Sequence, residues 1–177
     1  FTLISQHAVR FALGAAVPGG GAAAPEGEQL LAEDRFEVRF VRGGRATAAL
    51  LGEIGRLRAG AFRTAGEGGG RTCDLDGFDA YYDHLILWDR AGRRLAGAYR
   101  LCDVNQVLAA RGLDGLYTHS LFDYDASLFA ALPGRAIELG RSFVSPDYRR
   151  AYRPLYLLWK GIGVLAARRP EVRVLFG

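Results

Sequence analysis

The C-terminal segment Ile137–Phe176 constrains the fold most, because it predicts a strand, a helix and a second strand in direct succession. Ile137–Val144 and Val172–Phe176 are the predicted strands. Pro154 suits the first turn of the helix, where its missing N–H costs nothing, and the helix is expected to end near Arg169, before a proline. If the two strands are parallel, the segment is a right-handed crossover unit.

The preceding part of the chain predicts strands and helices from the spacing of its apolar residues. The resulting order is β-α-β-β-(short α)-β-α-β, an α/β (α+β) sandwich with antiparallel strands first. The predicted elements are a strand over Phe36–Val41, a helix over Ala46–Phe62, a hairpin of Leu85–Trp88 and Leu95–Leu101, and short helices over Val104–Arg111 and Ala126–Leu132. In the last helix the predicted buried stripe is Leu155, Leu158, Trp159, Ile162, Leu165 and Ala166.

The composition favours a globular protein with a mildly basic surface. Hydrophobic residues make up 50% and charged residues 24% of the chain, which excludes a disordered class. The formal net charge is +4, and Lys160 is the only lysine, so the positive charge is almost entirely arginine. A basic surface favours an acidic partner such as anionic lipid, nucleic acid, coenzyme A or a carrier protein. No apolar run is long enough to span a bilayer.

Residues 1–33 are predicted to form a flexible N-terminal tail, and residues 34–177 the folded domain. The segment Val17–Glu28 is rich in Gly, Ala and Pro, as flexible linkers are. The chain contains no methionine, and it stops directly after the predicted strand Val172–Phe176. We therefore expect a piece of a longer protein, with a domain that is incomplete at its C-terminus.

Five short motifs occur in the order found in GNAT acyltransferases, and they resemble the ornithine-lipid and glycine-lipid synthases, a branch often labelled hemolysin-like. The acyl-homoserine-lactone synthases are more distant relatives. Each motif alone is weak, whereas five in order form a specific pattern over Phe36 to Gly177. The motifs are Leu57–Phe62, Asp76–Asp79 with Asp83 and His84, Gly97–Leu101, Glu138–Ser142, and Pro146–Arg150 followed by Leu157–Gly161.

The resemblance implies a GNAT-like acyl-CoA N-acyltransferase fold, with a mixed, mostly antiparallel sheet and a C-terminal βαβ unit. It implies transfer of a long-chain (3-hydroxy)fatty acyl group to the α-amine of an amino acid such as ornithine or glycine, in aminolipid biosynthesis. The donor is expected to be acyl-acyl-carrier protein, through its phosphopantetheine, or acyl-CoA, with no permanently bound cofactor and no metal. The expected partners are acyl carrier protein and the amino acid, without nucleic acid. We expect a cytoplasmic protein with peripheral contact to the inner face of the membrane.

Glu138 and Arg141 are the predicted catalytic residues. An amine that attacks a thioester must lose a proton, and a positioned carboxylate, acting directly or through water, gives about 10²–10⁴-fold acceleration. The oxyanion also needs donors, such as backbone N–H groups or an arginine. Residues three apart on a regular strand face opposite sides, so both line one site only if a bulge intervenes, to which Gly140 is suited. Alternatively, either residue is ion-paired at the edge of the sheet.

The acyl donor is expected to bind along the end of that strand and in the loop after it. GNAT enzymes have a bulge here that opens a gap for the pantetheine arm, and a helix N-terminus attracts phosphate. The usual GNAT loop is Gly-rich, whereas this one is arginine-rich, which favours a carrier-bound donor over acetyl-CoA. The alternative is a solvated basic turn. The predicted donor-binding residues are Ser142, Phe143, Val144, Arg149, Arg150 and Arg153.

The amino-acid acceptor is expected to contact carboxylates and arginines in the first half of the domain. A cationic amino acid favours carboxylates, and an arginine binds a carboxylate through two parallel hydrogen bonds. The alternatives are loop capping for the aspartates and an ordinary surface position for the arginines. A calcium loop is discounted because the Gly-spaced pattern is missing. The predicted acceptor-binding residues are Arg58, Phe62, Asp76, Asp79, Asp83 and Arg100.

Two other functions remain open, a homoserine-lactone-type signal synthase and a non-enzymatic basic binding module. The first predicts a tryptophan shortly after the LRxxxF segment, but the two tryptophans are Trp88 and Trp159. The second requires arginines on one face with stacking aromatics, whereas here they occur in every predicted element. A serine hydrolase is excluded because the sequence has no G-x-S-x-G motif.

Overall fold

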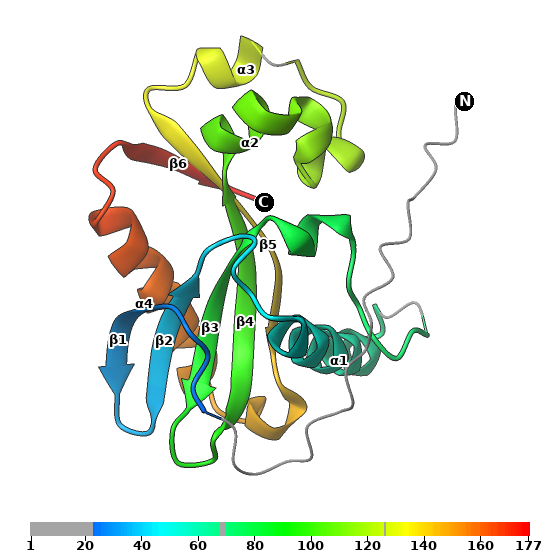
Figure 1. Cartoon of the computed structure of the whole chain (residues 1–177), viewed down its shortest axis with the longest axis vertical. Coiled ribbons are helices and arrows are strands. Elements are labelled where there is room, and N and C mark those ends of the chain that lie inside the picture. The colour runs from blue at the N-terminus through cyan, green and yellow to red at the C-terminus, as the bar shows by residue number, and fades with distance from the viewer. Residues whose placement is uncertain (1–22, 68–69, 126) are drawn as a thin grey trace.

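The fold is built on a single mixed sheet. The computed structural model describes residues 23–67, 70–125 and 127–177. Within them, six strands lie in chain order β1-β2-β3-β4-β5-β6 (Figure 1). Each adjacent pair from β1 to β5 is antiparallel, and the last pair, β5 and β6, is parallel. The strands are β1 Glu28–Glu33, β2 Phe36–Val41, β3 Asp83–Asp89, β4 Arg94–Asp103, β5 Arg135–Val144 and β6 Val172–Phe176.

The helices follow the predicted order, and the crossover between β5 and β6 is confirmed. The first helix begins after Thr47, whose side-chain oxygen accepts a hydrogen bond from the Leu50 N–H, and ends at Gly66. The α-helices are α1 Ala48–Ala65, α2 Val104–Arg111, α3 Ser127–Ala130 and α4 Arg153–Ala167. The 3-10 helices are η1 Gly77–Ala80, η2 Leu113–Gly115, η3 Thr118–Ser120 and η4 Pro146–Tyr148. No helix among the described residues has the length and apolar character that crossing a membrane requires.

The two longest helices cover opposite faces of the sheet. Alternation along β3 sends Leu85 and Leu87 into the apolar cluster under α4, and Ile86 into the cluster under α1. Figure 1 shows α1 and α4 on either side of the strands, with α2 and α3 together near one end of the sheet. The site described below lies on the α1 side, where polar side chains replace apolar ones.

Helix α4 approaches the sheet closely at one glycine. A Cβ atom at Gly161 would lie 2.6 Å from a methyl group of Val38, whereas one at Gly163 would meet nothing within 4 Å. Close packing therefore explains the first glycine and not the second. The predicted stripe was wrong for Leu155 and Trp159, which are exposed, because the helix turns Leu157 toward the sheet in their place.

Strand β5 contains the predicted bulge. Ala98 pairs with Phe143 and Arg100 pairs with Gly140, so two residues of β5 face one residue of β4. The left-handed backbone falls on Arg141, with φ of 49°, and not on Gly140. Such a conformation is uncommon for a residue with a side chain, so the surrounding contacts must hold it in place.

The predicted start of the folded domain near Asp34 was too late. Strand β1 begins at Glu28 and pairs with β2, and its Leu30 is buried in the cluster under α4. A short edge strand that directly follows a Gly/Pro-rich segment lacks a long alternating pattern, and this hides it from periodicity analysis. The predicted tail over residues 1–22 lies outside the described residues.

Candidate functional site

Glu138 is the polar centre of the α1 side of the sheet. It lies opposite Cys102 of β4, and its side chain is almost fully buried, with 1% relative exposure. Oε2 accepts a hydrogen bond from the Tyr82 hydroxyl at 2.8 Å, and Oε1 accepts one from the Thr118 backbone N–H at 2.7 Å. Charged acceptors form the stronger class of hydrogen bonds, so these two donors fix the carboxylate firmly. Glu138 lies inside the sheet and not at its edge, and the hydroxyl, thiol and backbone N–H that donate to it are neutral groups.

A second cluster alternates arginine and aspartate beside this carboxylate. At its base, Arg58 of α1 donates to both oxygens of Asp79, at 3.0 and 2.7 Å, and also to the carbonyl oxygen of Asp74. Both charged side chains are buried. A buried pair of this kind is stable only when the remaining hydrogen-bonding capacity is also satisfied, as it is here. Arg58 is therefore neither a surface residue nor an exposed binding group.

The η1 turn fixes the positions of Asp76 and Asp79, which pair with the arginines of this cluster. Asp76 caps the turn by accepting a hydrogen bond from the Phe78 N–H at 2.9 Å, and Asp79 accepts one from the Asp76 N–H at 2.9 Å. Burial raises the pKa of Asp79, but the hydrogen bond from Arg58 and the charges of Arg58 and Arg100 outweigh it and leave that pKa lowered. Asp79 is therefore ionised at neutral pH.

Arg100 of β4 joins the two halves of the site. It lies 2.5 Å from Asp76 and 3.3 Å from Asp79, and it is buried. Three aromatic rings surround its guanidinium, with centroids 5.0 to 5.5 Å from the central carbon. These rings belong to Phe78, Tyr82 and Tyr117. Because Tyr82 also binds Glu138, the cation and the carboxylate are held by the same ring.

Because of the bulge, Arg141 lies at the partly exposed side of the same cluster. Its guanidinium lies 3.2 Å from Asp74 and 3.7 Å from Asp76, and its side chain keeps 26% relative exposure. It also lies over the rings of Phe62 and Tyr117, at 5.8 and 5.2 Å. The structure thus brings Glu138 and Arg141 to one face, as the prediction of a bulge required. Arg141 is at the same time ion-paired.

The predicted acceptor residues divide into two places. Arg58, Phe62, Asp76, Asp79 and Arg100 all belong to the cluster just described, whose three arginines balance its three aspartates. The expectation of free carboxylates for a cationic amino acid is therefore wrong for Asp79, whose side chain is fully buried against two arginines.

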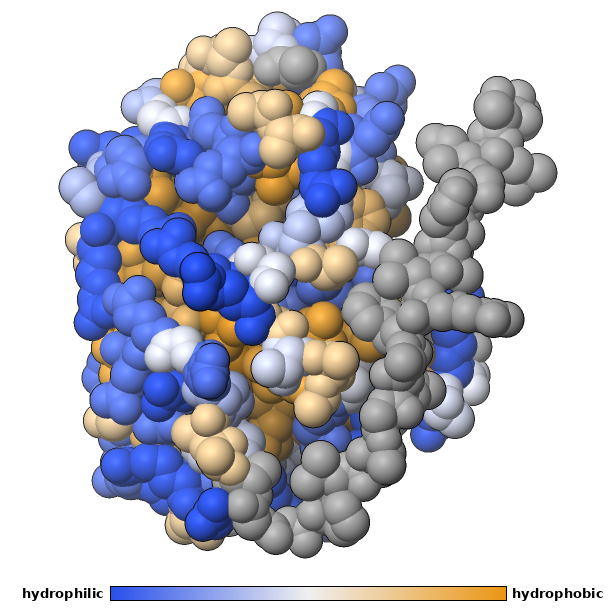
Figure 2. All heavy atoms as spheres, in the orientation of Figure 1, coloured by the Kyte–Doolittle hydropathy of each residue, from blue (hydrophilic) through white to orange (hydrophobic). Residues whose placement is uncertain are grey.

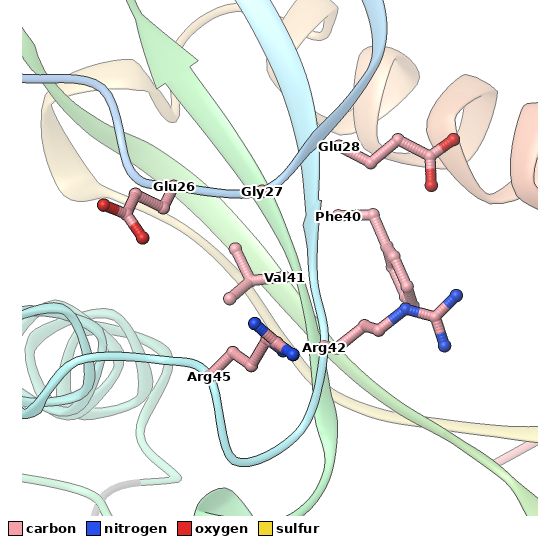
Figure 3. A pocket seen from close by; sticks show the side chains of 7 residues that line it. All are labelled: Glu26, Gly27, Glu28, Phe40, Val41, Arg42 and Arg45. Atoms are coloured by element: carbon pink, nitrogen blue, oxygen red, sulfur yellow. The ribbon is translucent and has the colours of Figure 1, made fainter.

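Asp83 lies apart from the cluster. It accepts a hydrogen bond from the Gly43 N–H at 2.6 Å, and burial raises its pKa. It lines a polar hollow of about 350 Å³ together with Asp103 and Arg135. The neighbouring His84 is buried, and its pKa is lowered by burial. A second hollow, of about 370 Å³ (Figure 3), contains no predicted site residue. Its lining is Glu26, Gly27, Glu28, Phe40, Val41, Arg42 and Arg45.

The predicted donor residues on β5 continue beyond the bulge. Phe143 is buried in the cluster under α1, and Val144 packs against the cluster under α4, while Ser142 is half-buried. Core packing occupies the side chains of Phe143 and Val144, so contact with a donor there would fall to their backbone groups. Strand β6 pairs with β5 from Arg135 to Glu138.

The arginine-rich loop does not gather its three guanidinium groups at one point. Arg149 donates to the carbonyl oxygen of Ala61 at 2.8 Å, at the end of α1. Arg153 lies 2.5 Å from Asp34, in the turn between β1 and β2. Arg150 is exposed. Two of the three cations thus bind protein groups in this arrangement, and phosphate binding by the loop stays a prediction.

Sequence analysis did not single out four residues of the site, Asp74, Tyr82, Tyr117 and Thr118. Asp74 sits two residues before Asp76, a spacing that could have indicated it. Tyr117 acts through its ring face, Tyr82 through its hydroxyl and Thr118 through its backbone N–H. Neither residue type nor spacing reveals such contacts, because they depend on how the η2–η3 segment folds over β5.

Residues 57–160 match the family model described as "Acetyltransferase (GNAT) domain". The glycine N(alpha)-acyltransferase of Bacteroides thetaiotaomicron is 37% identical over 139 residues, which cover 72% of this chain and 41% of that protein. The one from Phocaeicola vulgatus is 33% identical over 138 residues, covering 72% and 42%. The L-ornithine N(alpha)-acyltransferase of Agrobacterium fabrum is 39% identical over 140 residues, covering 76% and 44%.

The chain spans less than half the length of these relatives. No solved structure gives a significant match. The family model nevertheless covers more than half of the chain, including the second half of α1, the ion-pair cluster, the bulged β5 and the first half of α4. The mixed sheet with its β5-α4-β6 crossover agrees with that match. The chain therefore belongs to the GNAT acetyltransferase family.

Proposed function

We propose that this protein is an amide-forming N-acyltransferase that transfers a long-chain (3-hydroxy)fatty acyl group to the α-amine of glycine or ornithine, in aminolipid biosynthesis. Family membership supports the reaction class, and the curated relatives named above motivate the two amino acids. The observation that carries the proposal is the buried carboxylate of Glu138, held by two donors beside a bulge that brings Arg141 to the same face.

Glu138 is the proposed proton acceptor. The neutral amine nitrogen attacks the thioester carbonyl carbon, a C–N bond forms, the C–S bond breaks, and the sulfur leaves as a thiolate. The proton lost by the amine passes to Glu138 through an ordered water, because the side chain is too buried for direct contact. Arg141, which is partly exposed, supplies positive charge next to the oxyanion.

The proposed acceptor entrance is the open edge of the ion-pair cluster. Asp74, Asp76 and Arg141 are its partly exposed charged members, and Phe62 adds an apolar wall. An α-amino acid carries one ammonium and one carboxylate, which match an aspartate and an arginine respectively. Because the cluster has equal numbers of both charges, it suits a zwitterion such as glycine as well as ornithine.

The proposed donor is an acyl carrier protein, with acyl-CoA as the alternative thioester. Arg149 and Arg150 are exposed immediately before α4, and an acidic carrier would be attracted to that basic surface. Backbone groups of Ser142, Phe143 and Val144 lie along β5 between the bulge and this loop, on a direct path for a pantetheine arm.

We also propose peripheral contact with the inner face of a membrane. Helix α4 exposes Leu155, Tyr156 and Trp159, and the residue before it, Tyr152, is also exposed, with relative exposures from 47% to 80%. Aromatic side chains beside arginines favour the lipid headgroup region. Figure 2 shows hydrophilic and hydrophobic atoms interspersed over the face turned to the viewer, with hydrophobic atoms near α3 at the top and over the middle of the molecule. Binding to anionic vesicles that weakens in Trp159→Ala would support the contact, and equal binding of both forms would oppose it.

The reaction is tested with the full-length protein, acyl-carrier protein or acyl-CoA, and glycine or ornithine, with mass spectrometry of the acylated product. Glu138→Gln should reduce kcat by about 10²–10⁴-fold, the usual contribution of a general base. Glu37→Gln is the matched control, because Glu37 is also a buried glutamate on a central strand but lies outside the site. Full activity of Glu138→Gln would exclude the assigned base, and absence of product with every donor and amine would exclude the reaction.

A further inference from the structure

The segment that follows α2 lies over Glu138 and contributes hydrogen bonds that hold its carboxylate. The Thr118 N–H, at the start of η3, binds Oε1, and Tyr117, one residue earlier, donates its N–H to the Tyr82 hydroxyl at 2.8 Å. The Tyr82 hydroxyl in turn binds Oε2 of Glu138. The carboxylate is therefore held by a closed ring of hydrogen bonds that includes two consecutive backbone N–H groups.

The Tyr82 hydroxyl has a defined direction in this ring. A phenol has one proton to donate, and its oxygen accepts through its lone pairs. The Tyr117 N–H occupies the accepting side, which turns the proton toward an acceptor. Glu138 Oε2 lies at 2.8 Å and the carbonyl oxygen of Gly115 at 3.3 Å, so the shorter contact to the charged group takes the proton.

We propose that Tyr82 is a positioning residue for the base, an inference that rests on the proposed role of Glu138. Its hydroxyl holds the carboxylate in one orientation through a hydrogen bond that a charged acceptor makes stronger than a neutral one. The Oε1 atom, which accepts from the Thr118 N–H, keeps a second lone pair, through which it receives the proton of the amine.

The groups that face Glu138 do not change charge in the acid range. Tyr82, Cys102 and Tyr124 approach it from the residue before β3, from β4 and from the loop before α3, and burial raises the pKa of all three. Each stays protonated at neutral pH and below. Arg100 lies over the Tyr82 ring at 5.2 Å and remains cationic. A change in the acid limb of the rate profile is therefore not caused by titration of these groups.

The test replaces Tyr82 by phenylalanine in the full-length protein. Loss of a hydrogen bond to a charged group should lower kcat by roughly 10- to 100-fold, leave the donor KM unchanged, and move the acid limb of the kcat profile to higher pH. Tyr81→Phe is the matched control: the Tyr81 hydroxyl donates to the same Gly115 carbonyl oxygen at 2.9 Å, whereas the hydrogen bond to Glu138 comes from Tyr82. It should leave the acid limb in place.

The inference is overturned if Tyr82→Phe leaves the acid limb unmoved, or if both tyrosine variants lower kcat equally, since that would indicate a structural role alone. Replacing Tyr82 by 3-fluorotyrosine keeps the ring and strengthens the donor, so it should move the acid limb to lower pH even if the phenylalanine variant does not fold. Activity retained in Glu138→Gln would instead refute the base assignment. An inactive Glu138→Gln with an unaffected Tyr82→Phe refutes the positioning role alone.

Discussion

Two groups of arginines in this molecule look alike in the sequence and behave differently in the structure. The inner arginines, Arg58, Arg100 and Arg141, lie on the α1 side of the sheet and alternate with aspartates. The loop arginines, Arg149, Arg150 and Arg153, precede or begin α4 and lie at the surface or make partly exposed contacts.

The difference lies in how completely each group is removed from water. A cation that is buried must keep its partner, because losing one member leaves an unpaired charge in a low dielectric. A cation at the surface is screened by solvent, and its ion pair contributes little to stability. Arg58 and Arg100, which are buried, are therefore fixed parts of the architecture, whereas the ion pairs of the loop arginines contribute little to stability.

The largest expected difference in stability between the two groups of arginines is at Arg58. Arg58→Ala should lower the free energy of unfolding by about 3–5 kcal/mol, because it leaves the buried Asp79 without its bidentate partner. Urea denaturation measures the loss. Arg56→Ala is the matched control on the same helix: its pair with Glu53 is exposed and should cost no more than about 1 kcal/mol. Equal losses in the two variants would show that the buried ion pair stabilises the fold no more than the exposed one.

Acid should destabilise the protein through the inner cluster, because Asp79 must stay ionised to pair with its arginines. The folded-state pKa of Asp79 is lowered, so its contribution to stability is complete above the ordinary value of roughly 3.9 and is lost as the pH falls through the folded-state pKa. The free energy of unfolding should therefore decline as the pH drops below about 4. Asp89, whose pKa is lowered by Arg35, Gly92 and Tyr148 despite burial, adds to the decline.

Denaturation curves measured in steps from pH 6 to pH 2 test this expectation. Asp79→Asn cannot ionise at this position, so the variant should be less stable at pH 6 and show a shallower decline with acid. An unchanged slope in the variant would mean that Asp79 is not the group that titrates. A decline that begins above pH 5 would point to different groups.

The order of elements could be predicted from the sequence, because it depends on periodicity that is local. The strands Phe36–Val41 and Val172–Phe176 and the helix Val104–Arg111 were predicted with the bounds that the structure has. Strand β1 was missed because six residues beside a Gly/Pro-rich segment carry too little pattern. The bulge was implied by the resemblance to GNAT enzymes and was required for Glu138 and Arg141 to share one site, but its strained residue is Arg141 and not Gly140.

The pairing within the site could not be predicted in the same way. Arg58 and Asp79 are 21 residues apart, and nothing local indicates that α1 sets the arginine against the η1 turn. Ion pairing of this kind depends on tertiary packing, and arginine is mostly exposed in proteins, so sequence patterns favour a surface position. The hydrogen bond to Oε1 of Glu138 comes from a backbone N–H, which every residue except proline carries, so no residue type indicates it.

A smaller effect is expected at Arg153, the loop arginine that is tied to the sheet. Its guanidinium pairs with Glu33 and Asp34 at the turn between β1 and β2. Arg153→Ala should reduce the free energy of unfolding by no more than about 1 kcal/mol, and the loss should shrink further in 1 M salt. A loss as large as that of Arg58→Ala, or one that salt leaves unchanged, would contradict the division between inner and loop arginines.

The smallest change in stability is expected at Arg150, where the comparison predicts an effect on binding. Arg150→Ala should leave the free energy of unfolding within about 0.5 kcal/mol, because the side chain is exposed. If the basic surface before α4 attracts the carrier or its phosphate, the KM for the acyl donor should rise about two- to fivefold while kcat stays constant. The rise should disappear at high salt, since screening removes the advantage that Arg150 gives. Arg71→Ala, at an exposed arginine outside the loop, is the control and should leave the donor KM unchanged. An equal rise in both variants would reduce the effect to net charge.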